Sequence, residues 1–177
     1  MTARQIILIT AAYALVLAAV VYFTRATSRR VVGALAGGAI VGLMGLGAIA
    51  LGESLGWWRI PSASTPYFVP LIYLGFAVSS SPIYLVTWRI VRRFGWQGLA
   101  VSIGVAAVIG PPRDYLYAAT FPAWMTFAPG VAPILADGAT YVGIVALGHG
   151  VMQLVAGPAR EDRLARTLRP TTSAPHK

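Results

Sequence analysis

The chain has 177 residues, of which 57% are hydrophobic and only 11% are charged, a composition that excludes an ordinary soluble globular domain. It contains no cysteine, which excludes disulfide bonds, thiol nucleophiles, iron–sulfur clusters and cysteine-ligated zinc. Its formal net charge of +9 comes from short basic clusters without interleaved aromatic side chains for base stacking, so no nucleic-acid partner is expected.

Long apolar segments follow one another along the chain. A helix needs about 20 apolar residues to cross about 30 Å of hydrocarbon, and residues 5–23 and 31–51 reach that length. The sequence therefore predicts an all-α, polytopic membrane helical bundle in one domain, residues 1–159, followed by a basic tail, residues 160–177. The predicted transmembrane helices are residues 5–23, 31–51, 67–88, 96–113 and 131–156.

Breaks in the apolar pattern mark the loops and irregularities. Residues 52–66 are polar and rich in turn-forming residues, which predicts an outer loop or an interfacial segment. In the third span, Pro82 lacks a backbone donor, and the serines at 79–81 can bond to the freed carbonyl groups. We therefore expect a kink in this helix.

The fourth span is interrupted by the sequence Gly-Pro-Pro at 110–112. This break comes after about 15 residues, or roughly 22 Å of helix, which is short of a full crossing. Either the helix continues, kinked, to about Ala119, or residues 113–130 lie along the outer surface. In both cases the aromatic residues of this segment suit a membrane interface.

The basic residues predict the orientation of the chain. Most of them fall into three clusters, which are Arg25, Arg29 and Arg30; Arg89, Arg92 and Arg93; and Arg160, Arg163, Arg166, Arg169 and Lys177. Cytoplasmic loops of membrane proteins carry an excess of Lys and Arg. Five spans, with the N-terminus outside and the C-terminus in the cytoplasm, satisfy this bias for all three clusters, whereas a sixth span over residues 111–128 would place the tail outside. We therefore expect a multi-pass protein of the cell (cytoplasmic) membrane.

Glycines in the second span predict close helix packing. Gly33 and Gly37, and likewise Gly38 and Gly42, are four residues apart and share a helix face. We expect these faces to pack inside the same bundle; the alternative is a homo-oligomer or another helix-packing partner.

Three acidic residues are the candidate catalytic groups, namely Asp137, Glu53 and Asp114, and all three fall on the outer side in this topology. Asp137 lies within an apolar run, about 9 Å from its outer end, where an ionisable group needs a cavity or a partner. The alternative is a structural pair with Arg113 or Arg59. Glu53 can equally be an interfacial loop residue, and Asp114 can pair locally with Arg113. A carboxyl group against apolar walls favours its neutral form and can donate a proton.

Aromatic residues are dense on the same side. Aromatic faces stabilise cations, so a cavity that combines them with acids suits carbocation chemistry on a prenyl chain; it also suits a lipid-binding groove. Tyr117 belongs to this aromatic group. The candidate substrate-binding residues are Trp57, Trp58, Tyr67, Arg59, Arg113, Tyr115, Trp124 and Tyr141.

Other kinds of chemistry find little support in the sequence. His149 lies between two glycines, which allows axial ligation of a haem or chlorophyll, but a hydrogen bond between helices, for instance with Gln153, is the expected role. No phosphate-binding loop, nucleophile elbow, histidine-rich cluster or aspartate-rich metal motif occurs. We therefore expect neither a metal nor a cofactor, and any enzyme activity would proceed by proton transfer.

The order of these residues resembles that of membrane carotenoid-biosynthesis proteins of the bacterioruberin-hydratase type, over residues 52–145. The matching features are Glu53, Gly56 and Trp57 after a span, then Asp114 about ten residues before Trp124, then Pro129, Gly130 and Pro133, and a polar–aromatic helix start with Asp137 and Tyr141. The resemblance implies acid-catalysed addition or cyclisation at a terminal isoprenoid double bond.

The leading hypothesis is therefore an integral membrane protein that binds a hydrophobic, lipid-like isoprenoid and catalyses its metal-free, acid-initiated cyclisation or hydration. One alternative is a non-catalytic structural subunit of a larger membrane complex. Another is a small-solute carrier, which would need a polar pathway across both leaflets.

Overall fold

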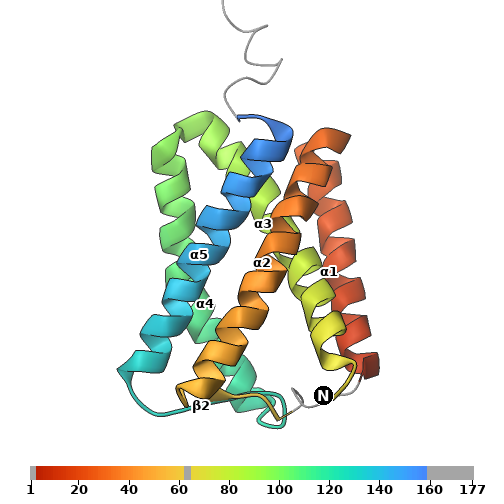
Figure 1. Cartoon of the computed structure of the whole chain (residues 1–177). Helices are drawn as coiled ribbons and strands as arrows, with labels where there is room; N and C mark the ends of the chain where they lie inside the picture. Colours follow the sequence, from red (N-terminus) through yellow and green to blue (C-terminus); the bar gives the residue numbers. More distant parts are fainter. Residues whose placement is uncertain (1–2, 62–64, 159–177) are drawn as a thin grey trace, which may run out of the picture.

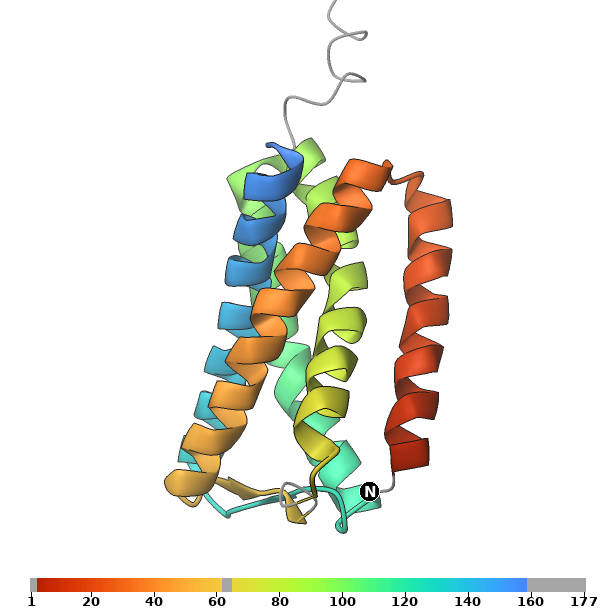
Figure 2. The same ribbon diagram turned by 45° about the vertical axis from the view of Figure 1, so that its right-hand side comes forward.

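Five long helices run alternately up and down in one bundle (Figures 1 and 2). The computed structural model describes residues 3–61 and 65–158, and the predicted tail over 160–177 lies outside them. The all-α prediction is confirmed for these residues, with two very short strands in addition. The elements are α1 (Ala3–Thr24), α2 (Ser28–Ser54), β1 (Trp58–Arg59), α3 (Phe68–Phe94), α4 (Trp96–Thr120), β2 (Thr126–Phe127) and α5 (Val131–Ala156).

The helices have the length and apolar character of membrane spans. Within the described part of the chain, α1, α2, α3 and α5 are long and apolar enough to cross a membrane. Their outer surfaces carry large exposed apolar side chains, such as Leu15 on α1 and Leu154 on α5. These features indicate a multi-pass membrane protein. Helix α4 has 25 residues, more than the 22 of α1, but it has no stretch as apolar as those of the other four helices.

Helix α4 extends further than the predicted span over residues 96–113. It continues without a break through Pro111 and Pro112 and ends at Thr120, so the helix does not stop at 113, and the alternative in which it continues to about Ala119 is the correct one. This part of α4 packs closely on α5, and Gly110 and Pro111 of α4 are buried. The prolines are tolerated because the neighbouring helix packs against this segment. The helix ends where Pro122 disfavours the helical conformation of Phe121.

Small residues bring the helices of this bundle together, as the sequence predicts. A methyl group added to Gly33 would lie 2.9 Å from the Cβ of Ala156 on α5, and one added to Gly38 would overlap the carbonyl oxygen of Ala77 on α3. Gly37 faces Gly148 on α5 in the same way, and Gly42 faces Tyr73 on α3. The two glycine faces of α2 therefore pack inside the chain, with α2 between α3 and α5, while α1 packs on α3.

The serines before Pro82 act differently from the prediction. Ser80 and Ser81 donate to the carbonyl oxygens of Phe76 and Ala77, each at 2.7 Å. The carbonyl that Pro82 leaves without its usual helical donor is instead that of Val78, four residues before the proline. Ser81 lies 3.2 Å from the carbonyl oxygen of Ala34, so it also links α3 to α2.

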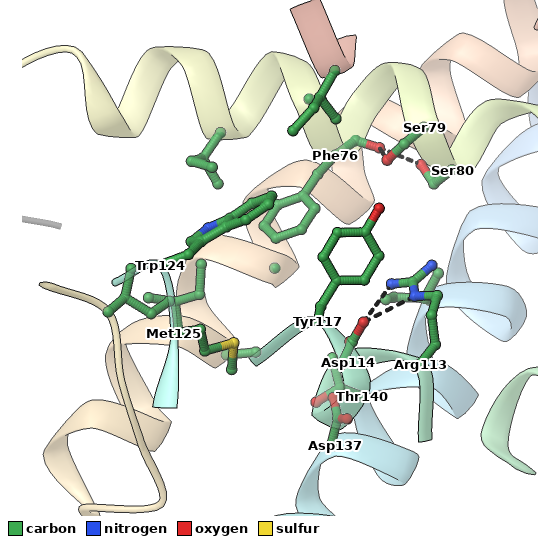
Figure 3. A pocket seen from close by; sticks show the side chains of 18 of the residues that line it. Phe76, Ser79, Ser80, Arg113, Asp114, Tyr117, Trp124, Met125, Asp137 and Thr140 are labelled. Atoms are coloured by element: carbon green, nitrogen blue, oxygen red, sulfur yellow. Dashed lines mark hydrogen bonds and ion pairs between the residues drawn. The ribbon is translucent and has the colours of Figure 1, made fainter. Parts of the chain in front are cut away.

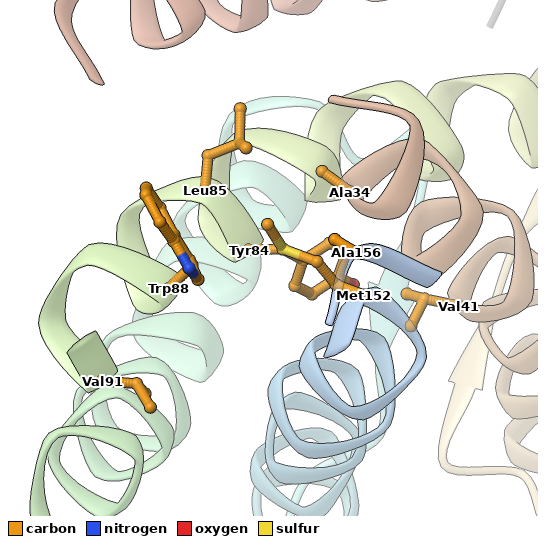
Figure 4. Close-up of a cluster of buried hydrophobic side chains, with 8 residues drawn as sticks. All are labelled: Ala34, Val41, Tyr84, Leu85, Trp88, Val91, Met152 and Ala156. Carbon is orange, nitrogen blue, oxygen red and sulfur yellow. The ribbon is translucent and has the colours of Figure 1, made fainter. Parts of the chain in front are cut away.

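The main hydrophobic core occupies the half of the bundle near the ends of α3 and α5 (Figure 4). Tyr84 and Leu85 are fully buried there, and the Tyr84 hydroxyl group donates to the carbonyl oxygen of Ile144 at 3.3 Å. The core consists of Ala34, Val41, Tyr84, Leu85, Trp88, Val91, Met152 and Ala156.

The opposite end of the bundle is covered by the paired strands β1 and β2 and the described residues next to them. Strands β1 and β2 pair antiparallel, with Trp58 opposite Phe127 and Arg59 opposite Thr126. The amide of Ala128 also donates to the carbonyl oxygen of Trp57 at 2.8 Å. Residues 57–59 and 126–128, which the sequence places on the same side of the membrane, are thus joined into one cover.

Candidate functional site

A partly open cavity of about 270 Å³ lies beneath this cover, and all five helices contribute to its wall (Figure 3). Most of the wall is apolar. Three charged residues, Arg113, Asp114 and Asp137, belong to it as well. The other residues that the following description uses are Ile6, Ile9, Thr10, Tyr13, Trp58, Phe76, Ser79, Ser80, Tyr117, Ala118, Trp124, Met125, Thr140 and Tyr141.

Arg113, Asp114 and Tyr141 form a closed hydrogen-bonded group in the wall. The Arg113 guanidinium group donates to Oδ1 of Asp114 at 2.7 and 2.9 Å, and it also donates to the Tyr141 hydroxyl group. That hydroxyl group donates to Oδ2 of Asp114 at 2.7 Å. Both oxygens of Asp114 therefore have partners, and the local pair of Arg113 with Asp114 that the sequence suggests is confirmed.

The close packing of α4 on α5 creates this group. The ring of Tyr141 occupies the place where Gly110 has no side chain, and a methyl group on Gly110 would overlap the ring. Arg113 follows Gly110 by three residues and so lies one turn further along the same face of α4. The guanidinium carbon of Arg113 is 5.5 Å from the centre of the Tyr141 ring, within reach of a cation–π contact.

Asp137 lies in a different environment, one turn before Tyr141 on α5. Its side chain lines the cavity but the residue is only 7% exposed, and its Oδ2 has no hydrogen-bond partner among the described residues. The salt bridge of Arg113 is made to Asp114. The suggested structural pair of Asp137 with Arg113 or Arg59 is therefore not formed. Because buried polar groups almost always have partners, this carboxyl group is an exception that calls for a functional reason.

Glu53 does not join the other two acids. It is exposed at the end of α2, and its Oε1 accepts a hydrogen bond from the amide of Ile60 at 2.8 Å. It borders a separate shallow hollow on the outer surface together with Arg59 and Thr126. Glu53 thus holds the covering segment in place, and the predicted catalytic group of three acids is reduced to Asp137 and Asp114.

Strand β1 places its two residues, Trp58 and Arg59, on opposite sides: Trp58 faces the cavity and Arg59 faces away from it. Trp58 is buried and lines the cavity, and its indole Nε1 donates to the carbonyl oxygen of Ile49 at 3.2 Å. Arg59 points outward, because successive side chains of a strand alternate between its faces. The absence of a side chain at Gly52 leaves room for the Trp58 ring.

The remaining predicted substrate-binding residues also divide. Trp124 and Tyr141 line the cavity with Trp58 and Arg113. Trp57, Tyr67 and Tyr115 do not. The Tyr115 ring instead stacks on Phe127, with ring centres 4.0 Å apart, and so supports the cover from outside the cavity wall.

Sequence reasoning missed the contribution of α1 and α3 to the wall. Ile6, Ile9, Thr10 and Tyr13 all line the cavity, and their spacing of three and four residues places them on one helix face. A threonine and a tyrosine on one face of an otherwise apolar helix were a detectable signal. Helix α3 contributes Phe76, Ser79 and Ser80 among others, and this was missed because the serines were interpreted as partners of a kink and placed in the inner half of the membrane.

His149 contacts Gln153, the partner that the sequence suggests, but the contact lies within α5 and does not join two helices, and its Nδ1 has no partner among the described residues. His149 is 1% exposed, and its Nε2 lies 2.8 Å from Nε2 of Gln153, one turn further along α5. It does not line the cavity. Among the described residues, no group of three or more His, Cys, Asp or Glu side chains could hold a metal ion.

The fold and the cavity define a helical, multi-pass membrane protein with a mainly apolar, partly open cavity and a carboxyl-containing wall. Comparisons with protein-family models, curated proteins and solved structures found no match for the chain. Its function is therefore inferred from the residues of the cavity.

Proposed function

We propose that the protein binds a hydrophobic isoprenoid in the cavity and catalyses its metal-free, acid-initiated cyclisation or hydration, with Asp137 as the proton donor. The observation that carries this proposal is the buried carboxyl group of Asp137, unpaired in the wall of an apolar cavity. A buried carboxyl group without a cationic partner is more easily accommodated as the neutral acid than as the carboxylate. The neutral acid is the form that can donate a proton.

The proposed reaction begins with transfer of the Asp137 proton to a terminal double bond. A new C–H bond forms, the O–H bond breaks, and the products are a tertiary carbocation and the Asp137 carboxylate. The carbocation then accepts electrons from a second double bond, which closes a ring, or from the oxygen of a water molecule. Loss of a proton to the Asp137 carboxylate completes either route and regenerates the acid, so the net change is isomerisation or addition of water.

Other residues of the wall suit this chemistry. The faces of Tyr117, Trp124 and Phe76 can stabilise the positive charge of the intermediate. Arg113 and Tyr141 hold the Asp114 carboxylate in place by hydrogen bonds. These three residues form a group of fixed dipoles close to the reacting end of the substrate. Because these groups are already oriented, they need no rearrangement when the charge develops.

The size of the cavity limits how much of the substrate it encloses. An apolar cavity of about 150 Å³ holds one benzene ring. A cavity of about 270 Å³ therefore has room for a ring and several further carbon atoms. We propose that it encloses the reacting end of a longer isoprenoid, whose remaining chain lies outside the cavity in the lipid.

The lipids that co-purify with the protein test the ligand class. We expect mass spectrometry to detect an isoprenoid on the wild-type protein, and at least tenfold less of it on Ala118→Trp, because an indole ring at 118 would fill the cavity. The matched control is Ala119→Trp, since Ala119 is exposed and does not line the cavity. Phospholipid alone on the wild-type protein, or equal isoprenoid content in the two variants, would contradict the proposed ligand.

The alternative functions find less support. The glycine faces of α2 are occupied within the bundle, so they are not available to a partner subunit. The core around Tyr84 and Leu85 packs the bundle beyond the cavity with mainly apolar side chains, which is unfavourable for the polar pathway that a solute carrier needs. The cavity favours a binding protein or enzyme for a hydrophobic molecule.

The proposed function includes five crossings of the cytoplasmic membrane, with the N-terminus outside and the C-terminus inside. Six arginines at the end of the bundle where α1 and α3 end support this orientation. Arg89 donates to the carbonyl oxygen of Phe23 at 3.1 Å, and Arg29 to that of Val155 at 3.3 Å, so this basic end is closely connected. The six are Arg25, Arg29, Arg30, Arg89, Arg92 and Arg93.

Reporter fusions test this topology. We expect a fluorescent protein fused after Lys177 or after Phe94 to fluoresce in the cytoplasm, because the adjacent arginines favour that side. Alkaline phosphatase fused after Ala123 should be active outside the cytoplasmic membrane, since α4 would then have crossed it. Fusions after Phe94 and Ala123 that report the same side would show that α4 does not cross, and external activity after Lys177 would reverse the orientation.

A further inference from the structure

The cavity wall carries one charged group whose charge no neighbour balances. Its charged residues are Arg113, Asp114 and Asp137, and the first two neutralise each other in a 2.7 Å salt bridge. When Asp137 has lost its proton, the chamber therefore has a net charge of −1. It is complementary to a ligand with a single positive charge, and it disfavours an anionic ligand such as a phosphate or carboxylate.

The aromatic residues of the wall add to this preference. Phe76, Tyr117 and Trp124 all line the cavity, and in the view of Figure 3 the Tyr117 ring lies between Phe76 and the Arg113–Asp114 pair. Aromatic faces attract cations, most strongly when the cation is removed from water. Carboxyl and aromatic groups in one wall are the combination that recognises a substituted ammonium ion.

We infer that the cavity binds lipophilic tertiary amines, with the amine nitrogen at Asp137 and the alkyl chain along the apolar wall. The neutral amine enters from the lipid, and its nitrogen lone pair accepts the proton of the Asp137 carboxyl group. One O–H bond breaks and one N–H bond forms, which leaves an ammonium ion beside a carboxylate. No other reactant is needed.

This inference rests on the proposed function, because the ammonium ion reproduces the charges of the proposed intermediate. In both states a single positive charge lies beside the Asp137 carboxylate and among the same aromatic rings. An enzyme binds mimics of such a high-energy state more tightly than it binds its substrate. A tertiary amine is therefore expected to inhibit the proposed reaction as well as to bind.

The binding preference can be measured with a matched pair of probes. N,N-dimethyldodecylamine and 2-methyltetradecane have the same shape and differ in whether nitrogen or CH occupies the branch point. Apparent dissociation constants follow from the dependence of the melting temperature on probe concentration, with the purified protein in lipid nanodiscs. We expect the amine to bind at least tenfold more tightly than the hydrocarbon.

Variants of the wall assign the preference to Asp137. In Asp137→Asn the amine should bind at least tenfold more weakly than in the wild type, while the hydrocarbon is unaffected. Glu53→Gln is the matched control, because Glu53 is an acid at the same end of the bundle that does not line the cavity. If Asp137→Asn does not fold, Tyr117→Leu provides the test, and should weaken amine binding about threefold or more through loss of the cation–π contact.

Equal affinity of the wild-type protein for the two probes would overturn the inference, as would unchanged amine binding in Asp137→Asn or, where that variant does not fold, in Tyr117→Leu. The two proposals can fail separately. Amine binding that depends on Asp137, together with full product formation in Asp137→Asn, would leave the binding site and remove the catalytic role. Product formation that depends on Asp137 without any preference for the amine would do the reverse.

Discussion

Membranes that contain the Asp137→Asn variant are expected to form at least about 100-fold less cyclised or hydrated product than membranes with the wild-type protein. The amide has nearly the same shape as the carboxylic acid but cannot supply the acidic proton, and general acid catalysis typically contributes 10²–10⁴-fold to a rate. The substrate is the isoprenoid that co-purifies with the wild-type protein. Product formed in deuterated water should carry deuterium on the protonated carbon, which mass spectrometry detects.

The control for this experiment is Glu53→Gln, which removes the charge of the exposed acid outside the cavity. The amide oxygen of Gln can still accept the hydrogen bond from the Ile60 amide, so the cover over the cavity should remain in place. We expect this variant to keep full activity. An unchanged melting temperature of Asp137→Asn would show that its loss of activity is chemical, and full activity in Asp137→Asn would refute Asp137 as the donor.

The largest effect on stability is expected from Gly38→Ala, which should lower the free energy of unfolding by about 1–3 kcal/mol. The added methyl group would overlap the backbone carbonyl oxygen of Ala77 on α3, and it would also lie 2.7 Å from Oγ of Ser81. A backbone carbonyl group cannot turn away as a flexible side chain can, so α2 and α3 would have to separate. The melting temperature of the purified protein in detergent measures the change.

Gly47→Ala on the same helix is the matched control. Gly47 is exposed and has no other atom within 4 Å of the position of an added methyl group. Alanine is favoured over glycine within a helix by roughly 0.5–1 kcal/mol, so this variant should be equally stable or slightly more stable. Equal melting temperatures for Gly38→Ala and the wild type would mean that α2 and α3 do not approach as closely as the structure indicates.

The sequence predicted the helical class and most of the helix positions because these depend on local composition. The small residues at Gly33, Gly37, Gly38 and Gly42 also predicted close packing within the bundle, since glycine alone leaves room for a neighbouring backbone. The end of α4 was less predictable. Prolines at 111 and 112 usually end a helix, and only the packing of this segment on α5 allows it to continue to Thr120.

The candidate site was predicted in part. Asp137, Asp114, Arg113, Trp58, Trp124 and Tyr141 were all identified from residue type and position, and they share one cavity. Glu53 was grouped with them because it lies on the same side of the membrane in the predicted topology. Position along the membrane normal says nothing about the direction of a side chain: Glu53 is exposed at the end of α2 and β1 turns Arg59 outward, so both lie outside the cavity.

The order of apolar and charged residues by itself determined that this chain forms an all-helical bundle with acids and aromatic side chains near one end, because hydropathy and charge are properties of each segment alone. Only the tertiary structure decided which acid is paired and which is not. The pairing depends on how α4 and α5 are rotated against each other, and this rotation follows from the fit of the Tyr141 ring against Gly110. With that fit, Arg113 is bonded to Asp114, and Asp137 faces the cavity without a partner for its buried oxygen.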